Sequence, residues 1–119
     1  MKILVVDDDP STRILLDRLL TSWGYETMLS DRGERALELL NDTPDCQLTI
    51  LDWMMPGLSG LEVCQALRAD TRLRHLPVIL LTSRNSPEDR DLARQAGVNR
   101  FLVKPVDRDE LKSSLQELA

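Results

Sequence analysis

Polar side chains able to bind a metal ion or a phosphoryl group follow four short apolar runs along the chain. Asp7 and Asp8 come directly after the first run, and Asp52 follows the second. Thr82 follows the third run and Lys104 the fourth. Each residue alone has an ordinary explanation, since acidic loops and hydroxyl-ended strands are common. Chance does not readily place the whole set at the ends of four separate runs, so we predict that the five side chains meet in one site.

The residue types in this set favour Mg²⁺-dependent phosphoryl transfer. Three close carboxylates repel one another, which raises the free energy of their full ionisation. Mg²⁺ relieves that repulsion, because it accepts one or two carboxylates, keeps several waters and completes its shell with phosphate oxygens. A carboxylate beside Mg²⁺ can attack a phosphoryl group in line and become an aspartyl phosphate. The Lys104 ammonium and the Thr82 hydroxyl, with a backbone N–H, would then bind the remaining phosphoryl oxygens.

The apolar runs themselves predict buried parallel strands. They cover residues 3–6, 48–51, 78–81 and 101–103 and are nearly continuous rather than alternating, as in strands covered on both faces. Residues 25–29 mix polar and apolar side chains and predict a partly exposed edge strand. In an open α/β sheet, ligands bind beyond the carboxyl ends of the strands. The strands therefore position the polar residues in one pocket.

Stretches with helical spacing alternate with these strands, and capping residues mark their starts. Asp9-Pro10 and Ser86-Pro87 each combine a capping residue with proline at the first helical position. Capping-box spacing, a capping residue three before Glu, recurs at Asp31 and Glu34, Ser59 and Glu62, and Asp107 and Glu110. Gly24 and Gly97 stand where a helix commonly ends. The order β-α, five times over, predicts a doubly wound α/β sheet with helices on both faces.

Length, charge and composition exclude several classes of protein. The 119 residues fit one domain, and 42% hydrophobic residues exclude wholesale disorder. Fifteen Lys and Arg against 20 Asp and Glu give a net charge of −5, which argues against nucleic-acid binding and an anionic-membrane surface. No run approaches the roughly 20 apolar residues of a membrane span. Cys46 and Cys64 are interpreted as reduced thiols that form no zinc site with His75, so we expect a cytoplasmic protein.

Four segments together resemble a known family. They are residues 3–9, the run from Leu51 to Gly60 with its D-x-x-M-P-x-x-x-G pattern, residues 78–83, and Lys104-Pro105. This set closely resembles the receiver domain of bacterial two-component response regulators of the chemotaxis-regulator type. The resemblance covers essentially the whole chain and implies a single receiver domain over 1–119. It also implies a flavodoxin-like (βα)5 fold with strand order 2-1-3-4-5.

The resemblance implies a role for each residue of the acidic site. Asp52 would be the phosphoacceptor, and Asp7 and Asp8 would hold Mg²⁺ together with Asp52 and the backbone carbonyl of Met54. Lys104 would pair with the phosphoryl group and precede a cis peptide bond, a geometry expected almost only before proline.

The resemblance also implies how the site would signal. Thr82 would move toward the phosphoryl group, and Phe101 would swing into the space that Thr82 leaves. The face that reports the change would comprise the fourth helix, fifth strand and fifth helix, over residues 87–118. The implied partners are a histidine kinase or histidine phosphotransfer protein, and an output domain or target protein. The resemblance also allows a homodimer formed on phosphorylation.

Some positions depart from the commonest pattern of that family. Ser83 stands where a smaller residue is frequent. Met54 and Arg84 stand at positions that tune the access of water to the phosphoryl group. We expect Trp53 to be a partly exposed loop side chain. The fifth predicted helix, residues 107–119, runs to the last residue without a glycine stop. This leaves open both a stand-alone regulator and a receiver within a longer protein, slightly favours the latter, and does not indicate the output.

Three other functions fit parts of the sequence less well. Asp7-x-Asp9-x-Ser11 loosely matches the nucleophile motif of haloacid-dehalogenase-like phosphotransferases, although Ser11 replaces the usual Thr or Val and no acidic pair follows a later strand. A receiver-like interaction module that never carries phosphate is the second alternative. Nucleotide binding is the weakest, since neither of the common glycine-rich phosphate-binding motifs occurs. Asp52→Asn separates the first alternative, because a dehalogenase-like enzyme would still form its phosphoenzyme on Asp7.

Overall fold

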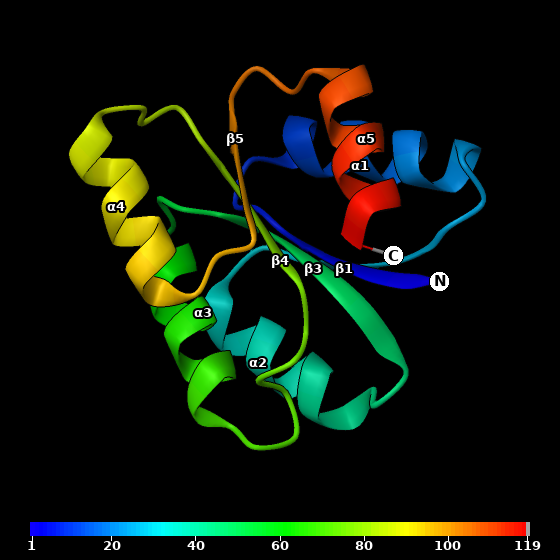
Figure 1. Ribbon diagram of the computed structural model, residues 1–119. Coiled ribbons are helices and arrows are strands. Elements are labelled where there is room, and N and C mark those ends of the chain that lie inside the picture. Colours follow the sequence, from blue (N-terminus) through cyan, green and yellow to red (C-terminus); the bar gives the residue numbers. More distant parts are fainter. Residues whose placement is uncertain (119) are drawn as a thin grey trace.

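Five parallel strands alternate with five helices along the chain (Figure 1), in a computed structural model that describes residues 1–118. The elements are β1 (Lys2–Val6), α1 (Pro10–Ser22), β2 (Glu26–Ser30), α2 (Gly33–Asp42), β3 (Cys46–Asp52), α3 (Gly60–Ala69), β4 (Val78–Thr82), α4 (Pro87–Ala96), β5 (Arg100–Val103) and α5 (Arg108–Leu118). The sheet has the order β2-β1-β3-β4-β5, and every pairing is parallel. The predicted doubly wound, flavodoxin-like (βα)5 fold and its strand order are confirmed.

The two faces of the sheet have separate apolar layers, which explains the continuous apolar runs. In β1, Ile3 and Val5 lie in the layer that α1 and α5 cover, while Leu4 and Val6 lie in the layer of α2, α3 and α4. Figure 1 shows α1 and α5 on one side of the strands and α2 and α3 on the other. Because successive strand residues point to opposite faces, both sets of side chains must be apolar.

The strand at the edge of the sheet beside β1 is β2, as its mixed composition predicted. Only its last residue, Ser30, is buried. Its pairing is with β1 alone, from Lys2 opposite Glu26 to Val6 opposite Ser30. Within residues 1–118, no helix is long and apolar enough to cross a lipid bilayer.

Most predicted helix starts are confirmed. Asp9 accepts a hydrogen bond from the Ser11 N–H at the start of α1. Ser59 forms a complete capping box with Glu62, and Asp107 accepts from the N–H of Glu110. At α4, Ser86 also forms a capping box, with Asp89 as its partner. The left-handed Gly97, with φ of 94°, ends α4 as predicted.

The predicted capping box of α2 is wrong. The helix begins at Gly33 after Arg32, with no side-chain cap. The carboxylate of Glu34 instead accepts a hydrogen bond of 2.9 Å from the N–H of Leu58. A Cβ at Gly33 would lie 2.9 Å from the Leu58 Cβ, so the start of α2 lies directly against the loop between β3 and α3. A tertiary partner thus replaces the local one for Glu34.

A second glycine, Gly60, allows β3 and α3 to approach each other closely. A Cβ at Gly60 would collide with the backbone carbonyl oxygen of Asp52, and the Gly60 N–H donates to the Trp53 carbonyl over 2.9 Å. The close approach fixes the first turn of α3 against the end of β3.

We predict that Gly60→Ala lowers the free energy of unfolding by about 1–3 kcal/mol, the usual effect of overpacking a filled site. Urea denaturation followed by circular dichroism measures the change. The matched control is Gln65→Ala on the exposed side of α3, which is expected to stay within about 0.5 kcal/mol of the parent. Equal stability of the two variants would contradict the close approach.

Candidate functional site

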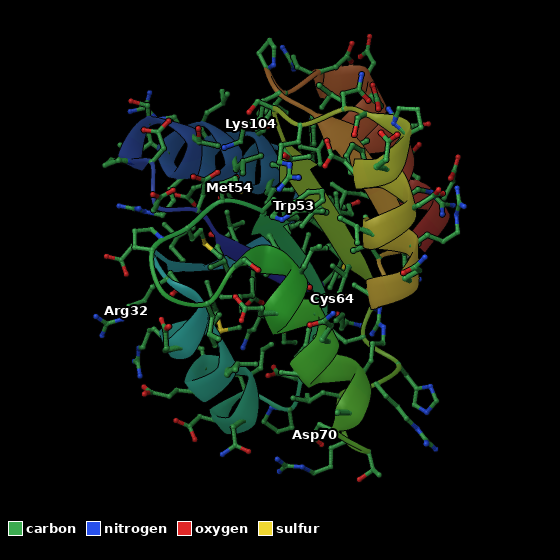
Figure 2. All side chains as sticks on the ribbon, turned by 90° about the vertical axis from the view of Figure 1, so that its left-hand side faces the viewer. Arg32, Trp53, Met54, Cys64, Asp70 and Lys104 are labelled. Carbon is green, nitrogen blue, oxygen red and sulfur yellow. The ribbon has the colours of Figure 1, made fainter. Side chains whose placement is uncertain are left out.

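The carboxyl ends of β1, β3, β4 and β5 converge at one edge of the sheet, as the sequence predicted. Asp7 and Asp8 follow β1, Asp52 is the last residue of β3, Thr82 is the last of β4, and Lys104 follows β5. Figure 2 shows Met54 and Lys104 near one end of the molecule and Asp70 at the opposite end. The strand order explains the convergence, because β1, β3 and β4 are adjacent in the sheet.

Three carboxylates form the acidic part of the site. Asp7, Asp8 and Asp52 each offer an oxygen within 4.8 Å of the others. Asp7 is 1% exposed and Asp52 is 6% exposed, while Asp8 faces solvent. Oxygen ligands of this kind suit a hard divalent cation that keeps part of its water shell. The residues present therefore fit Mg²⁺, with an open side through which water or a phosphoryl oxygen can reach it.

Lys104 bridges the two buried carboxylates. Its Nζ lies 2.9 Å from Oδ2 of Asp7 and 3.2 Å from Oδ1 of Asp52. The Lys104 N–H donates to the carbonyl of Thr82 over 2.8 Å, and the peptide bond to Pro105 is cis, as the resemblance implied. Burial alone would lower the pKa of Lys104, but its contacts with Asp7 and Asp52 raise that pKa above the ordinary value. The ammonium therefore stays charged.

Asp7 is held in one orientation from both of its oxygens. Oδ1 accepts from the N–H of Asp9 over 2.9 Å, and Oδ2 accepts from Lys104. The backbone carbonyl of Asp7 accepts from the guanidinium of Arg13 over 2.7 Å. These contacts fix the carboxylate toward Asp52.

The electrostatics of Asp52 reflect this crowded site. Burial raises the pKa of Asp52 to about 6, and the charge of Asp7 acts in the same direction. Lys104 opposes this shift without cancelling it. The ionised form, which a nucleophile requires, is therefore costly until a further cation approaches.

Thr82 lies at the site but does not contact the carboxylates. It is 1% exposed, and its Oγ1 accepts a hydrogen bond of 3.0 Å from the N–H of Arg84. Because this contact uses the hydroxyl oxygen as the acceptor, the O–H group can still donate to a strong acceptor that appears beside Asp52.

The expectation that Trp53 is partly exposed is wrong. Trp53 is 4% exposed, because its N–H still pairs with the Leu81 carbonyl at 3.1 Å and the chain keeps its strand direction past Asp52. Its ring meets that of Phe101 edge to face, with 6.3 Å between centroids and an interplanar angle of 88°. The residue after Asp52 thus contacts the residue that the resemblance assigns to signalling.

Two arginines cover this aromatic pair. The guanidinium of Arg84 lies 4.3 Å from the ring centre of Trp53, and that of Arg90 lies 4.7 Å from the ring centre of Phe101. Arg84 also forms an ion pair of 2.6 Å with Asp89 in the first turn of α4. Asp89 and Arg90 could not be identified as part of the site from the sequence, because their spacing indicates only a polar helix surface.

Met54 projects its side chain outward. The side chain is largely exposed, and its sulfur lies 3.8 Å from Nη1 of Arg84. The backbone of Met54 stands two residues after Asp52, in the loop that leads to α3. Its predicted part in binding Mg²⁺ stays a prediction.

Fold and site together define a (βα)5 domain with an acidic site at the carboxyl edge of its sheet, and sequence comparison shows the family to which it belongs. Residues 3–116 match the family model described as the response regulator receiver domain. The chain belongs to this family, whose members are signalling domains rather than conventional enzymes.

Named relatives include both short and long proteins. The chain is 37% identical over 117 residues to the chemotaxis protein CheY1 of Helicobacter pylori, with 98% of this chain and 94% of that protein covered. It is 38% identical over 119 residues to the chemotaxis protein CheY of Pseudomonas aeruginosa, with 99% and 95% covered. It is also 43% identical over 110 residues to the uncharacterized transcriptional regulatory protein YrkP of Bacillus subtilis, covering 92% of this chain but 46% of that protein.

Solved structures show the same architecture. The chemotaxis protein CheY4 of Vibrio cholerae has a TM-score of 0.93 at 30% identity, covering 99% of this chain and 98% of that one. A putative response regulator of Chloroflexus aurantiacus has a TM-score of 0.93 at 28% identity, with 98% and 95% covered.

The buried position of Trp53 beside Asp52 predicts an optical response. We expect the fluorescence of Trp53 to change when Mg²⁺ or a beryllofluoride phosphoryl mimic binds. Titration of a Trp23→Phe variant isolates the signal of Trp53. The response to Mg²⁺ should weaken strongly in Trp23→Phe/Asp52→Asn, and a flat titration with both ligands would contradict the site.

The raised pKa of Asp52 predicts a dependence of stability on pH. The folded state binds the proton of Asp52 more tightly than the unfolded state, because its pKa is about 6 rather than 3.8. The resulting stabilisation is complete below pH 3.8 and is lost as the pH rises through about 6. With EDTA present at pH 8, Asp52→Asn should therefore be more stable than the parent, by up to about 3 kcal/mol.

Denaturant unfolding between about pH 3 and 8, a range that contains this loss, measures the effect. The matched control is Asp31→Asn, an exposed aspartate, whose profile should follow that of the parent. Parallel profiles for Asp52→Asn and the parent would show that burial of Asp52 carries no such cost.

Proposed function

We propose that residues 1–119 form a single receiver domain that accepts a phosphoryl group on Asp52 and signals its presence. The observation that carries this proposal is the position of Lys104, 2.9 Å from Asp7 and 3.2 Å from Asp52, beside three converging carboxylates. Aspartate phosphorylation and Mg²⁺ are typical of the family. The donor is a histidine kinase or a histidine phosphotransfer protein.

The transfer follows from the chemistry of the side chains. An Asp52 carboxylate oxygen attacks the phosphorus of a phosphohistidine, and the new O–P bond forms as the P–N bond breaks. The electron pair of that bond leaves with the imidazole nitrogen of the donor. Asp7, Asp8, Asp52 and the Met54 carbonyl would hold Mg²⁺, which would neutralise the developing negative charge. Lys104 exchanges its contact with Asp52 for one with a phosphoryl oxygen.

The contacts around Thr82 and Phe101 support a switch mechanism. The phosphoryl group adds negative charge and strong acceptors beside the end of β4. Thr82 then moves toward the phosphoryl group and donates a hydrogen bond from its hydroxyl to a phosphoryl oxygen. This movement breaks its contact with the Arg84 N–H. Phe101 fills the vacated space, which alters its contacts with Trp53 and Arg90. Phosphorylation thus biases an equilibrium between two conformations through differential contacts.

The signal would be read at the face formed by α4, β5 and α5. Phe101 belongs to β5, and Arg90 projects from α4 over its ring. An output domain or a target protein would bind this face, and a phosphorylation-dependent homodimer would use the same surface. The domain itself would bind neither nucleic acid nor membrane.

The position of Asp9 disfavours a dehalogenase-like enzyme. In that mechanism Asp9 would act beside the nucleophile Asp7. Here both oxygens of Asp9 are engaged at the start of α1, with the Ser11 N–H at 3.1 Å and the Thr12 hydroxyl at 2.8 Å. These helix-capping contacts are the ordinary role of an aspartate at that position.

Acetyl phosphate with Mg²⁺ should add one acid-stable, base-labile phosphoryl group to the chain. Intact-mass measurement detects it, and Asp52→Asn should show none. Asp31→Asn is the matched control and should be phosphorylated like the parent. Equal incorporation in Asp52→Asn would contradict the assignment of the acceptor, and no incorporation in the parent would favour a receiver-like module without phosphate.

A further inference from the structure

The loop between β3 and α3 carries Met54 and has few internal constraints. Its two ends are fixed, because the Trp53 N–H donates to Leu81 and the Gly60 N–H donates to Trp53. Between them, residues 54–58 make one backbone hydrogen bond in the part of the chain that the structure describes. That bond runs from the N–H of Leu58 to Oε1 of Glu34, over 2.9 Å.

Glu34 reaches the loop because of how α2 begins. The helix has no side-chain cap, so the carboxylate of Glu34 in its first turn takes no part in a capping box. Gly33 lies close to Leu58, where a Cβ would come within 2.9 Å of the Leu58 Cβ. Figure 2 shows the loop extending from the labelled Met54 toward the start of α2, near Arg32.

The loop is shaped to receive this carboxylate. Gly57 has a φ of 75°, in the left-handed region that favours glycine, and a Cβ there would collide with Oε1 of Glu34. The bond from Leu58 also lowers the pKa of Glu34, which keeps the carboxylate ionised and a strong acceptor. Glu34 and the loop therefore fit each other at two successive residues.

We propose that Glu34 is a positioning residue for the Mg²⁺ site, acting through the N–H of Leu58 on the loop that carries the Met54 carbonyl. This inference rests on the proposed function. A cation that takes a backbone carbonyl from a loop must overcome the conformational entropy of ordering that loop. The contact from Glu34 orders the loop beforehand, so that binding Mg²⁺ requires less rearrangement.

The test separates this role from a simple effect of charge. Mg²⁺ affinity is measured without a phosphodonor, from the fluorescence of Trp53 in the Trp23→Phe background. We expect Glu34→Ala to weaken Mg²⁺ binding about 10-fold, the lower end of the effect of outer contacts on metal affinity. Glu34→Gln keeps an oxygen that accepts from Leu58 and should stay within about twofold of the parent.

The matched control is Glu38→Ala, which removes the same charge from α2 at an exposed ion pair with Arg35. It should leave Mg²⁺ affinity unchanged. Hydrogen exchange of the Leu58 amide gives a direct reading of the contact and should be faster in Glu34→Ala alone. Calorimetric titration with Mg²⁺ repeats the affinity measurement without any optical signal.

The outcomes distinguish this inference from the proposed function. Parent-like affinity in Glu34→Ala, or equal weakening in Glu34→Ala and Glu34→Gln, would overturn the positioning role. A parent that binds no Mg²⁺ by calorimetry would overturn the proposed function itself. Rescue by Gln together with restored protection of the Leu58 amide would support the inference, because lost charge or lowered stability alone predicts neither.

Discussion

The rest of the structure is organised around the repulsion between buried carboxylates at one edge of the sheet. Asp7 and Asp52 are both almost fully buried, and Lys104 is the one cation within contact of both in the described chain, residues 1–118. Burial and mutual repulsion disfavour two ionised carboxylates, as the raised pKa of Asp52 shows. A single ammonium cannot compensate three carboxylates. The fold therefore maintains a site with excess negative charge, in which added positive charge is favoured.

The surrounding elements keep these carboxylates close together. Parallel strands deliver the charged residues from distant parts of the sequence, and the hydrogen bonds to Asp7 prevent its carboxylate from turning away. Because residue 60 is glycine, α3 can begin directly against the end of β3. The apolar layers on both sides of the sheet supply the stability that such a site removes.

Sequence alone predicted the strands, the helices and the acidic cluster, since these follow from apolar runs and from the polar residues at their ends. The strand order came from the family resemblance, because local pattern does not determine which strands are neighbours. The predictions for Trp53 and Glu34 are wrong for a common reason. Local pattern indicates a loop residue for Trp53, but its contact with Phe101 buries it. Local pattern likewise indicates a capping residue for Glu34, but its carboxylate binds the N–H of Leu58. The contact of Arg90 with the ring of Phe101 could not be predicted from local pattern either.

The two apolar layers place α4 and α5 differently with respect to the residues beside Asp52. Trp53 and Phe101 belong to the layer of α2, α3 and α4, whereas the next residue of β5, Leu102, belongs to the layer of α1 and α5. A change in the packing of Trp53 and Phe101 therefore reaches α4 within one apolar layer, whereas α5 packs in the layer on the opposite face of the sheet. A protein bound to α4 would contact the layer that contains Trp53 and Phe101, whereas one bound to α5 alone would contact the other layer.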